Sequence, residues 1–146
     1  MNTVRDVTLE EAKKILDGAL KYAEKQSLTM SFAVVDRSGN LVAIYRMDNA
    51  ITLTPDWAIR KAFTASCLRT STTALADRIM SKKSSYTFYL KSDPRFLYVK
   101  GGIPIMESGK IIGAFGASGA TDEIDEKCAK EGLRYAEFST DFSHSE

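Results

Sequence analysis

Two predicted β-hairpins constrain the fold of this 146-residue chain more than any other feature. Their four strands are Met30–Asp36, Leu41–Met47, Ile103–Met106 and Ile111–Ser118. In the first loop, Gly39 and Asn40 supply the positive φ that a tight reversal needs. The strands of the first hairpin are apolar on both faces, which is typical of a sheet covered on both faces. We therefore expect an antiparallel sheet with helices, or a partner subunit, above and below it.

Helical periodicity accounts for much of the remaining chain. Apolar residues recur at helical spacing from Leu9 to about Gln26, behind a capping box over Thr8–Glu11. Thr54-Pro55 predicts an N-cap and the first position of another helix. The later predicted helices are Asp56–Leu68, Thr72–Met80 and Asp122–Ala136. The element order predicts an α+β fold, a three-layer α-β-α sandwich, in one domain over residues 1–136 with a polar, frayed tail over 137–146.

Composition excludes several functional classes. The net charge is +1 with 20 basic and 19 acidic residues, and no arm or face is visibly basic, so a nucleic-acid partner is not expected. No apolar run approaches the roughly 20 residues that a membrane span needs, and the N-terminus does not resemble a signal peptide. The two cysteines, Cys67 and Cys128, stand in no CxxC pattern and predict reduced thiols. These features favour a cytoplasmic protein.

Three glycines, Gly113, Gly116 and Gly119, lie within and just after the last predicted strand and precede the last predicted helix. Their GxxGxxG spacing differs from the dinucleotide-binding GxGxxG, and no following strand could supply a ribose-binding acid. The acidic residues at 122–126 would also repel a pyrophosphate, and they complement the helix dipole better than they would hold a cation. The glycines instead predict a close approach of the strand to a neighbouring backbone or a ligand.

The distribution of ionisable residues limits the possible catalytic chemistry. The only histidine, His144, lies in the tail, which argues against a histidine-rich zinc site or a Ser–His–Asp triad in the folded body. General acid–base catalysis would have to use a carboxylate, lysine or tyrosine, and Lys61, Asp36 and Arg46 are the candidate catalytic residues. Lys61 stands among small alanines, so its side chain is either partly buried or extends along the surface to water. The pattern leaves both open.

The segment around Gly101-Gly102 is the candidate ligand-binding region. Two residues without side chains either let the chain turn sharply into an edge strand, as the following Ile103-Pro104 suggests, or expose backbone N–H groups to an anion or macrocycle. The nearby tyrosines, Tyr86, Tyr89 and Tyr98, either line a pocket there or belong to the core.

Taken together, several fragments resemble the GlcG/HbpS family, which is described as haem-binding or haem-degrading and related to the C-terminal domain of PduO-type proteins. The fragments are Ala33-Val34-Val35-Asp36 with Gly39, Arg46-Met47-Asp48, Lys61-Ala62 with Thr64-Ala65, Gly101-Gly102-Ile103-Pro104-Ile105, Ile112 to Gly119, and Asp125-Glu126. Together they span about Thr8 to Ala136. Each is weak alone, but their order and spacing are specific.

The resemblance implies a five-stranded antiparallel sheet of profilin-like type and assembly into homo-oligomers. It also implies a ligand pocket near Gly101, Gly102 and the Lys61 helix, to which we assign Tyr98, Tyr86 and Ser118 as further binding residues. Haem or a related tetrapyrrole is the expected ligand, and no metal site of the chain's own is expected. The chain departs from histidine-ligating members, because its only histidine is in the tail. Iron would therefore be held by Tyr, Cys, Met or Lys, or the macrocycle by the pocket alone.

Two functional hypotheses follow. The first is a small-molecule-binding module that takes up haem or a related tetrapyrrole. The alternative is an enzyme or accessory subunit in the catabolism of a small oxygenated metabolite, of glycolate or diol type. In that alternative, Lys61 or Asp36 is the acid–base group and Arg46 orients a carboxylate.

Overall fold

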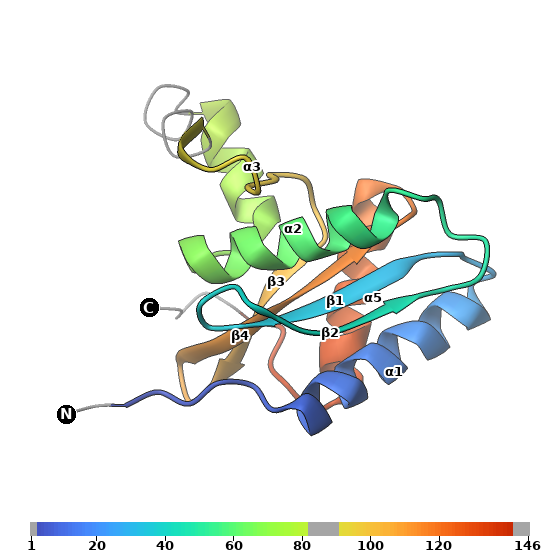
Figure 1. The fold of residues 1–146 in the computed structure, drawn as a ribbon, viewed down its shortest axis with the longest axis horizontal. Helices are drawn as coiled ribbons and strands as arrows, with labels where there is room; N and C mark the ends of the chain where they lie inside the picture. The colour runs from blue at the N-terminus through green and yellow to red at the C-terminus, as the bar shows by residue number, and fades with distance from the viewer. Residues whose placement is uncertain (1–2, 82–90, 142–146) are drawn as a thin grey trace.

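The computed structural model describes residues 3–81 and 91–141, and these build one antiparallel sheet with helices against both of its faces (Figure 1). The strands lie side by side in the order β2-β1-β4-β3. The elements are α1 (Leu9–Lys25), β1 (Ser31–Asp36), β2 (Leu41–Arg46), α2 (Thr54–Leu68), α3 (Thr72–Ser81), β3 (Gly102–Glu107), β4 (Lys110–Ser118) and α5 (Asp122–Tyr135).

Both predicted hairpins are present, and the two pack together through β1 and β4. Ser31 pairs with Arg46 on one side and with Ser118 on the other, while Asp36 pairs with Gly113 at the far end of the same strand. The described residues form four strands, where the resemblance implies five. The two hairpins account for all four, and the described chain that leads into β3, residues 93–101, carries no strand.

The two faces of the sheet are covered by different helices. Helix α2 lies over the face that presents Val35 and Ala114, and its own Ala62 and Ala65 complete a small-residue cluster there. Helices α1 and α5 lie over the opposite face, against a larger cluster that includes Phe32, Val34, Ile103, Ile105, Phe115, Leu16 and Leu133 (Figure 1). The apolar character of both faces of β1 is thus explained, because a helix layer buries each of them.

Glycines allow α2 to approach the sheet closely. A Cβ at Gly116 would collide with the backbone carbonyl of Ala58, and one at Gly102 would collide with the carbonyl of Lys61. A Cβ at Gly113 would collide instead with the Val35 carbonyl in the neighbouring strand β1. The glycine-rich strand therefore serves close backbone contact, as its spacing predicted, and this contact fixes the height of α2 above β3 and β4.

Helix caps follow the sequence with one exception. The Thr8–Glu11 capping box is present, with the Thr8 N–H donating to Glu11 Oε1 at 2.9 Å and the Glu11 N–H to Thr8 Oγ1 at 3.1 Å. Thr54, however, is not an N-cap: Leu53 holds that position without a side-chain bond, and Thr54 is the first residue of α2. The Thr54 hydroxyl instead donates to the Ile51 carbonyl at 2.7 Å and lies 3.0 Å from the Ser31 hydroxyl.

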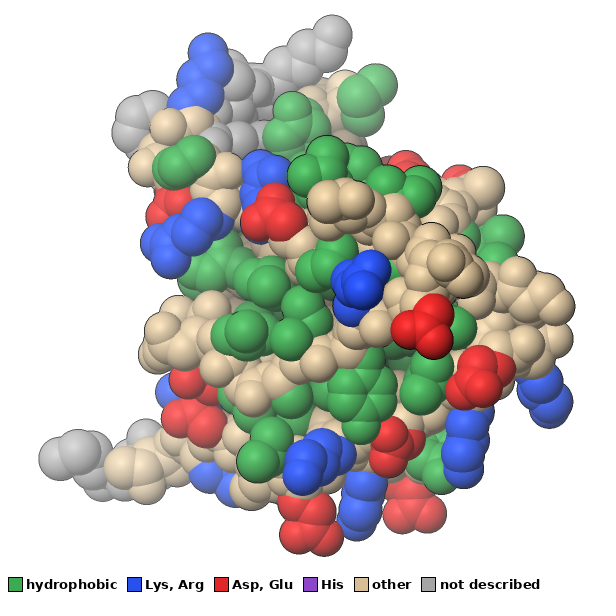
Figure 2. All heavy atoms as spheres, turned by 45° about the vertical axis from the view of Figure 1, so that its right-hand side comes forward, with side chains coloured by type: hydrophobic (Ala, Val, Ile, Leu, Met, Phe, Trp, Pro, Cys, Tyr) green, Lys and Arg blue, Asp and Glu red, His purple; other side chains and the backbone are tan. Residues whose placement is uncertain are grey.

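The surface carries charges of both signs, interspersed on the face seen in Figure 2. Cys67 is exposed and Cys128 buried, and neither forms a disulfide. None of the helices in the described ranges is long and apolar enough to cross a membrane. Residues 142–146 of the predicted tail, which include His144, lie outside the described residues.

Candidate functional site

Lys61 is buried, and its ammonium group crosses from α2 to the start of α5. Only 3% of its side chain is exposed. Its Nζ donates to Asp125 Oδ2 at 2.8 Å and to the carbonyl of Ala117, near the end of β4, at 3.0 Å. Of the two alternatives left open by the sequence, the structure therefore supports the buried lysine, and it supplies the carboxylate that compensates the buried charge.

The Gly101-Gly102 segment makes room for this ion pair. Gly101 has φ +124°, a conformation that side-chain-bearing residues rarely adopt. A Cβ there would lie 3.1 Å from Lys61 Nζ and 3.2 Å from Asp125 Cβ. The Gly101 carbonyl also accepts from the Ala117 N–H at 2.9 Å, which joins the segment to β4. The structure supports the first sequence interpretation, because the pair leads into the edge strand β3. It does not support exposed backbone N–H groups, because both glycines are buried and the Gly102 N–H donates to Thr72 Oγ1 at 2.9 Å.

Asp125 is held from both sides. Its Oδ1 accepts from the Ala120 N–H at 2.8 Å, and its Oδ2 accepts from Lys61. Burial raises the pKa of the Asp125 carboxyl above its ordinary value, and the Lys61 ammonium and the Ala120 N–H oppose that shift. The site is therefore a buried carboxylate–ammonium pair whose acid is easier to protonate than a surface aspartate.

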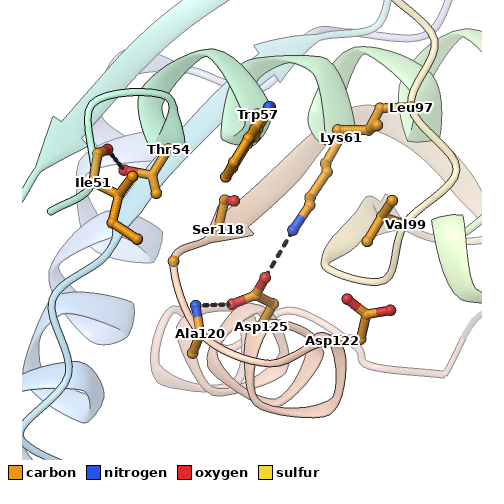
Figure 3. Close-up of a pocket in the computed structure, with 11 residues that line it drawn as sticks. Ile51, Thr54, Trp57, Lys61, Leu97, Val99, Ser118, Ala120, Asp122 and Asp125 are labelled. Carbon is orange, nitrogen blue, oxygen red and sulfur yellow. Dashed lines mark hydrogen bonds and ion pairs between the residues drawn. The ribbon is translucent and has the colours of Figure 1, made fainter.

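A pocket of about 400 Å³ opens onto this pair (Figure 3). The carbon-rich walls come from α2, from the loop before it and from the segment before β3, and the polar groups come from α2, β4 and α5. The lining residues are Ile51, Thr54, Trp57, Lys61, Leu97, Val99, Ser118, Gly119, Ala120, Asp122 and Asp125. An apolar cavity with a few converging polar groups is the usual form of a small-molecule site.

The structure brings some of the sequence-predicted site residues together here. Lys61 and Ser118 line the pocket, and Gly101 and Gly102 lie directly behind Lys61. Tyr98 is 46% exposed and stands between the lining residues Leu97 and Val99 without lining the pocket itself. Tyr86 and Tyr89 lie outside the described residues.

Asp36 and Arg46 do not reach Lys61. Asp36 lies at the end of β1 remote from the pocket, where its Oδ1 accepts from the Ser38 and Asn40 N–H groups at 2.9 Å and shapes the hairpin loop. Arg46 ends the edge strand β2, one strand beyond Ser31, and does not line the pocket. The three candidate catalytic residues are therefore not one constellation.

Sequence reasoning missed Trp57 as a pocket residue and placed Asp125 in a group interpreted as complement of the helix dipole. Trp57 precedes Lys61 by one helical turn, so spacing alone puts both on one face of α2. Asp122 and Asp125 share a face of α5 for the same reason. The signal for Asp125 was weaker, because nothing in its local sequence distinguishes a buried acid from its solvated neighbours.

A second depression, the β2 hollow, lies between α1 and the edge strand. Its volume is about 570 Å³ and it is lined by Leu20, Glu24, Ile44, Tyr45, Arg46, Met47 and Asp48. The Tyr45 hydroxyl donates to Asp17 at 2.8 Å, and Met47 Sδ accepts from the Met30 N–H at 3.4 Å. Within residues 3–81 and 91–141, no three His, Cys, Asp or Glu side chains gather as a metal site would need.

Comparison with known proteins places this geometry in a family. The profile of the family described as "Haem degrading protein HbpS-like" matches residues 7–134. An uncharacterized 15.0 kDa protein of Citrobacter freundii, from the dhaT-dhaS intergenic region, is 35% identical over 130 residues, which cover 89% of this chain and 92% of that protein.

Solved structures agree. A double mutant of Streptomyces reticuli HbpS is similar with a TM-score of 0.82 and 35% identity, covering 92% of this chain and 89% of the other. A complex of PduOC with haem has a TM-score of 0.85 at 22% identity, covering 92% and 98%, and at that identity it shows the fold alone. The order of the sequence fragments, the fold and the family profile agree, and the chain belongs to the GlcG/HbpS-like family.

Proposed function

We propose that this protein binds a small molecule in the pocket above Lys61 and Asp125. The observation that carries the proposal is the buried ion pair at the floor of a cavity with apolar walls. A buried pair is often no more stabilising than apolar residues of the same volume, so stability alone gives it little reason to be there. A pocket that opens onto it gives the ammonium and carboxylate a ligand to recognise.

The test uses a variant that narrows the pocket. Ala120 lines the cavity and is partly exposed, so Ala120→Leu should obstruct the site with little effect on the fold. Native mass spectrometry of the protein as purified, together with the emission of Trp57, should show a bound or added small molecule in the parent and not in Ala120→Leu. Ala76→Leu, at a partly buried position on α3 outside the lining, is the matched control. Equal occupancy in parent and Ala120→Leu would contradict the proposal.

Haem is the ligand that the family description suggests, and the Lys61 pocket does not fit its iron. The lining contains no histidine, cysteine, methionine or tyrosine, and its one lysine, Lys61, is already hydrogen-bonded to Asp125 and to the Ala117 carbonyl. Haem in this pocket would be held by its macrocycle alone.

The β2 hollow supplies what the Lys61 pocket lacks, and we propose it as the haem site. It presents the Met47 sulfur and the Tyr45 hydroxyl as candidate iron ligands, and Arg46 as a partner for a propionate. Bound haem would supply an iron centre there. The chain's own residues would orient it, at the cost of the present Tyr45–Asp17 and Met30–Met47 hydrogen bonds.

A hemin titration separates the two sites. A saturable shift of the Soret band is expected for the parent and for Ala120→Leu, and a weakened one for Arg46→Ala and Met47→Leu. Loss of the shift in Ala120→Leu alone would move haem to the Lys61 pocket, and no saturable shift in any variant would reject haem as a ligand.

The enzymatic alternative has support from one contact only. A lysine and an aspartate 2.8 Å apart can exchange a proton with a bound oxygenated metabolite, with Asp125 in the acid–base role first assigned to Asp36. Any activity found in a substrate screen should then be lost in Lys61→Arg and kept in Asp36→Asn. A role as an accessory subunit, a cytoplasmic location and assembly into homo-oligomers stay predictions, the last of them measurable by light scattering of the purified protein.

A further inference from the structure

The charges around the Lys61 pocket carry information about the ligand that the pocket can take. One ammonium group and two carboxylates line it, those of Lys61, Asp122 and Asp125, so negative charge is in excess by one. Lys100, which follows the lining residue Val99 in the chain, is paired with Glu123 at 3.4 Å. The one cation of the lining, Lys61, is thus already paired with a carboxylate, and the lining provides no unpaired cation for an anionic ligand.

The hydrogen-bonding capacity of the pocket is only partly used. A lysine ammonium has three N–H donors, and Lys61 directs two of them to Asp125 and Ala117. The Ser118 hydroxyl makes no hydrogen bond to the described residues. Every fully buried side-chain N or O atom of the described residues has a partner, so the Ser118 oxygen must be accessible, and Ser118 lines this pocket. A ligand oxygen thus finds donors from Lys61 and Ser118, and a ligand N–H or O–H finds the Asp122 carboxylate as acceptor.

The apolar wall completes the specification. Trp57 extends from α2 beside Lys61 and Ser118, with Leu97 and Val99 on the far side of Lys61 (Figure 3). These side chains can cover a ring or an alkyl group, and an indole face favours a planar one. The polar end of such a ligand would lie at the Lys61 ammonium.

From this arrangement we infer that the pocket selects an uncharged ligand that carries a carbonyl or hydroxyl oxygen next to an apolar body, and that it discriminates against carboxylates. The inference rests on the proposed function of the pocket and adds the class of its ligand. A carboxamide is a matched probe for this class, because its carbonyl accepts from Lys61 while its NH₂ group donates to Asp122. The corresponding carboxylate has nearly the same shape, loses the donor and adds the unfavourable charge.

Trp57 makes the test direct, because it is the only tryptophan of the chain and lines the pocket. Three probe pairs are titrated against its fluorescence: acetamide and acetate, benzamide and benzoate, phenylacetamide and phenylacetate. In each pair that binds, the amide should bind about tenfold more tightly, as expected for one excess charge a few ångströms away and partly screened by solvent.

Charge variants sharpen the result. Asp122→Asn removes the excess charge at an exposed position, and it should bring the two members of each pair to within about threefold. Glu10→Gln removes the same charge from an 84% exposed side chain on α1 and should leave the preference unchanged. Asp125→Asn frees the Lys61 ammonium, and where the variant folds, the preference should reverse toward the carboxylate. If Asp125→Asn does not fold, Asp122→Asn decides the question.

The outcomes separate the two proposals. Binding of carboxylates as tightly as amides, or an effect of Glu10→Gln equal to that of Asp122→Asn, would overturn the inferred ligand class and leave pocket binding intact. If none of the six probes changes Trp57 emission in a saturable way, and Ala120→Leu behaves as the parent in native mass spectrometry, the pocket itself is rejected.

Discussion

The face of the sheet under α2 and the face under α1 and α5 are packed in different ways. The α1/α5 face is filled by large side chains, among them Phe32 and Phe115 with ring centroids 6.2 Å apart. The α2 face is filled by alanines and by glycines whose missing side chains admit the helix backbone. Large side chains contribute buried apolar area, whereas small ones contribute proximity. The Lys61 pocket lies at the edge of the α2 face, where Lys61 of α2 reaches the Ala117 carbonyl of β4.

The largest effect is expected on the large-residue face. Phe115→Ala should lower the free energy of unfolding by about 3–5 kcal/mol, because it removes a fully buried ring and leaves a cavity between α5 and the sheet. Chemical denaturation measures the loss. Phe63→Ala, at a 7% exposed position on α2 whose ring contacts Arg95 at the surface, should cost less. Equal losses at both positions would contradict the proposed division between the faces.

On the α2 face, the ion pair should behave as a unit. Asp125→Ala leaves the Lys61 ammonium buried without its carboxylate and should cost about 3 kcal/mol. The double variant Lys61→Met/Asp125→Leu replaces both charges with apolar side chains. It should recover most of that loss, since apolar replacement of a buried pair is often neutral or stabilising. Equilibrium unfolding of the single and double variants forms the test. A double variant no more stable than Asp125→Ala would mean that the pair itself holds α2 to α5.

A smaller loss is expected from overpacking the close approach. Gly116→Ala places a Cβ against the Ala58 carbonyl, and a cost of about 1–3 kcal/mol is typical of such strain. Helix α2 must move to relieve it, so Trp57 emission should shift as well. Gly109→Ala, in a hairpin loop with no atom within 4 Å of the added Cβ, costs only the strain of its positive φ and should leave Trp57 unchanged.

The same contrast explains which parts of the structure could be predicted from the sequence. Strands, helix ends and the Thr8 cap depend on nearby residues, and their predicted bounds agree with the structure within about two residues at most ends. The glycine spacing also predicted close backbone approach. In contrast, the site depends on which helix end meets which strand. Asp125 looks like its acidic neighbours until α5 is packed beside β4, and Asp36 and Arg46 look like partners of Lys61 until the register separates them.

The smallest effect concerns the pH dependence of stability, to which Glu11 near α1 and Asp125 beside α2 contribute with opposite signs. On the α1 side, Arg5 binds Glu11 at 2.8 Å and Glu107 at 2.7 Å, and this lowers the pKa of Glu11 from 4.5 to about 2. The unfolded chain then binds more protons than the folded one between these values, so the stabilisation from Glu11 is complete above pH 4.5 and is lost as the pH falls toward 2.

Asp125 works in the opposite direction. Burial raises its pKa, so the folded state binds the extra proton and this group's contribution to stability decreases as the pH rises above 3.8. Urea unfolding across the acid range should therefore show a flatter loss of stability at low pH for Arg5→Gln. For Asp125→Asn the dependence on pH should become steeper, since the opposing contribution of Asp125 is removed while those of Glu11 and the other carboxylates with lowered pKa remain. The Arg5 cluster is solvent-exposed and screened, so added salt should weaken its contribution and leave that of Asp125 nearly unchanged. If the free energy of unfolding of both variants depended on pH as it does in the parent, neither ion pair would control the response to acid.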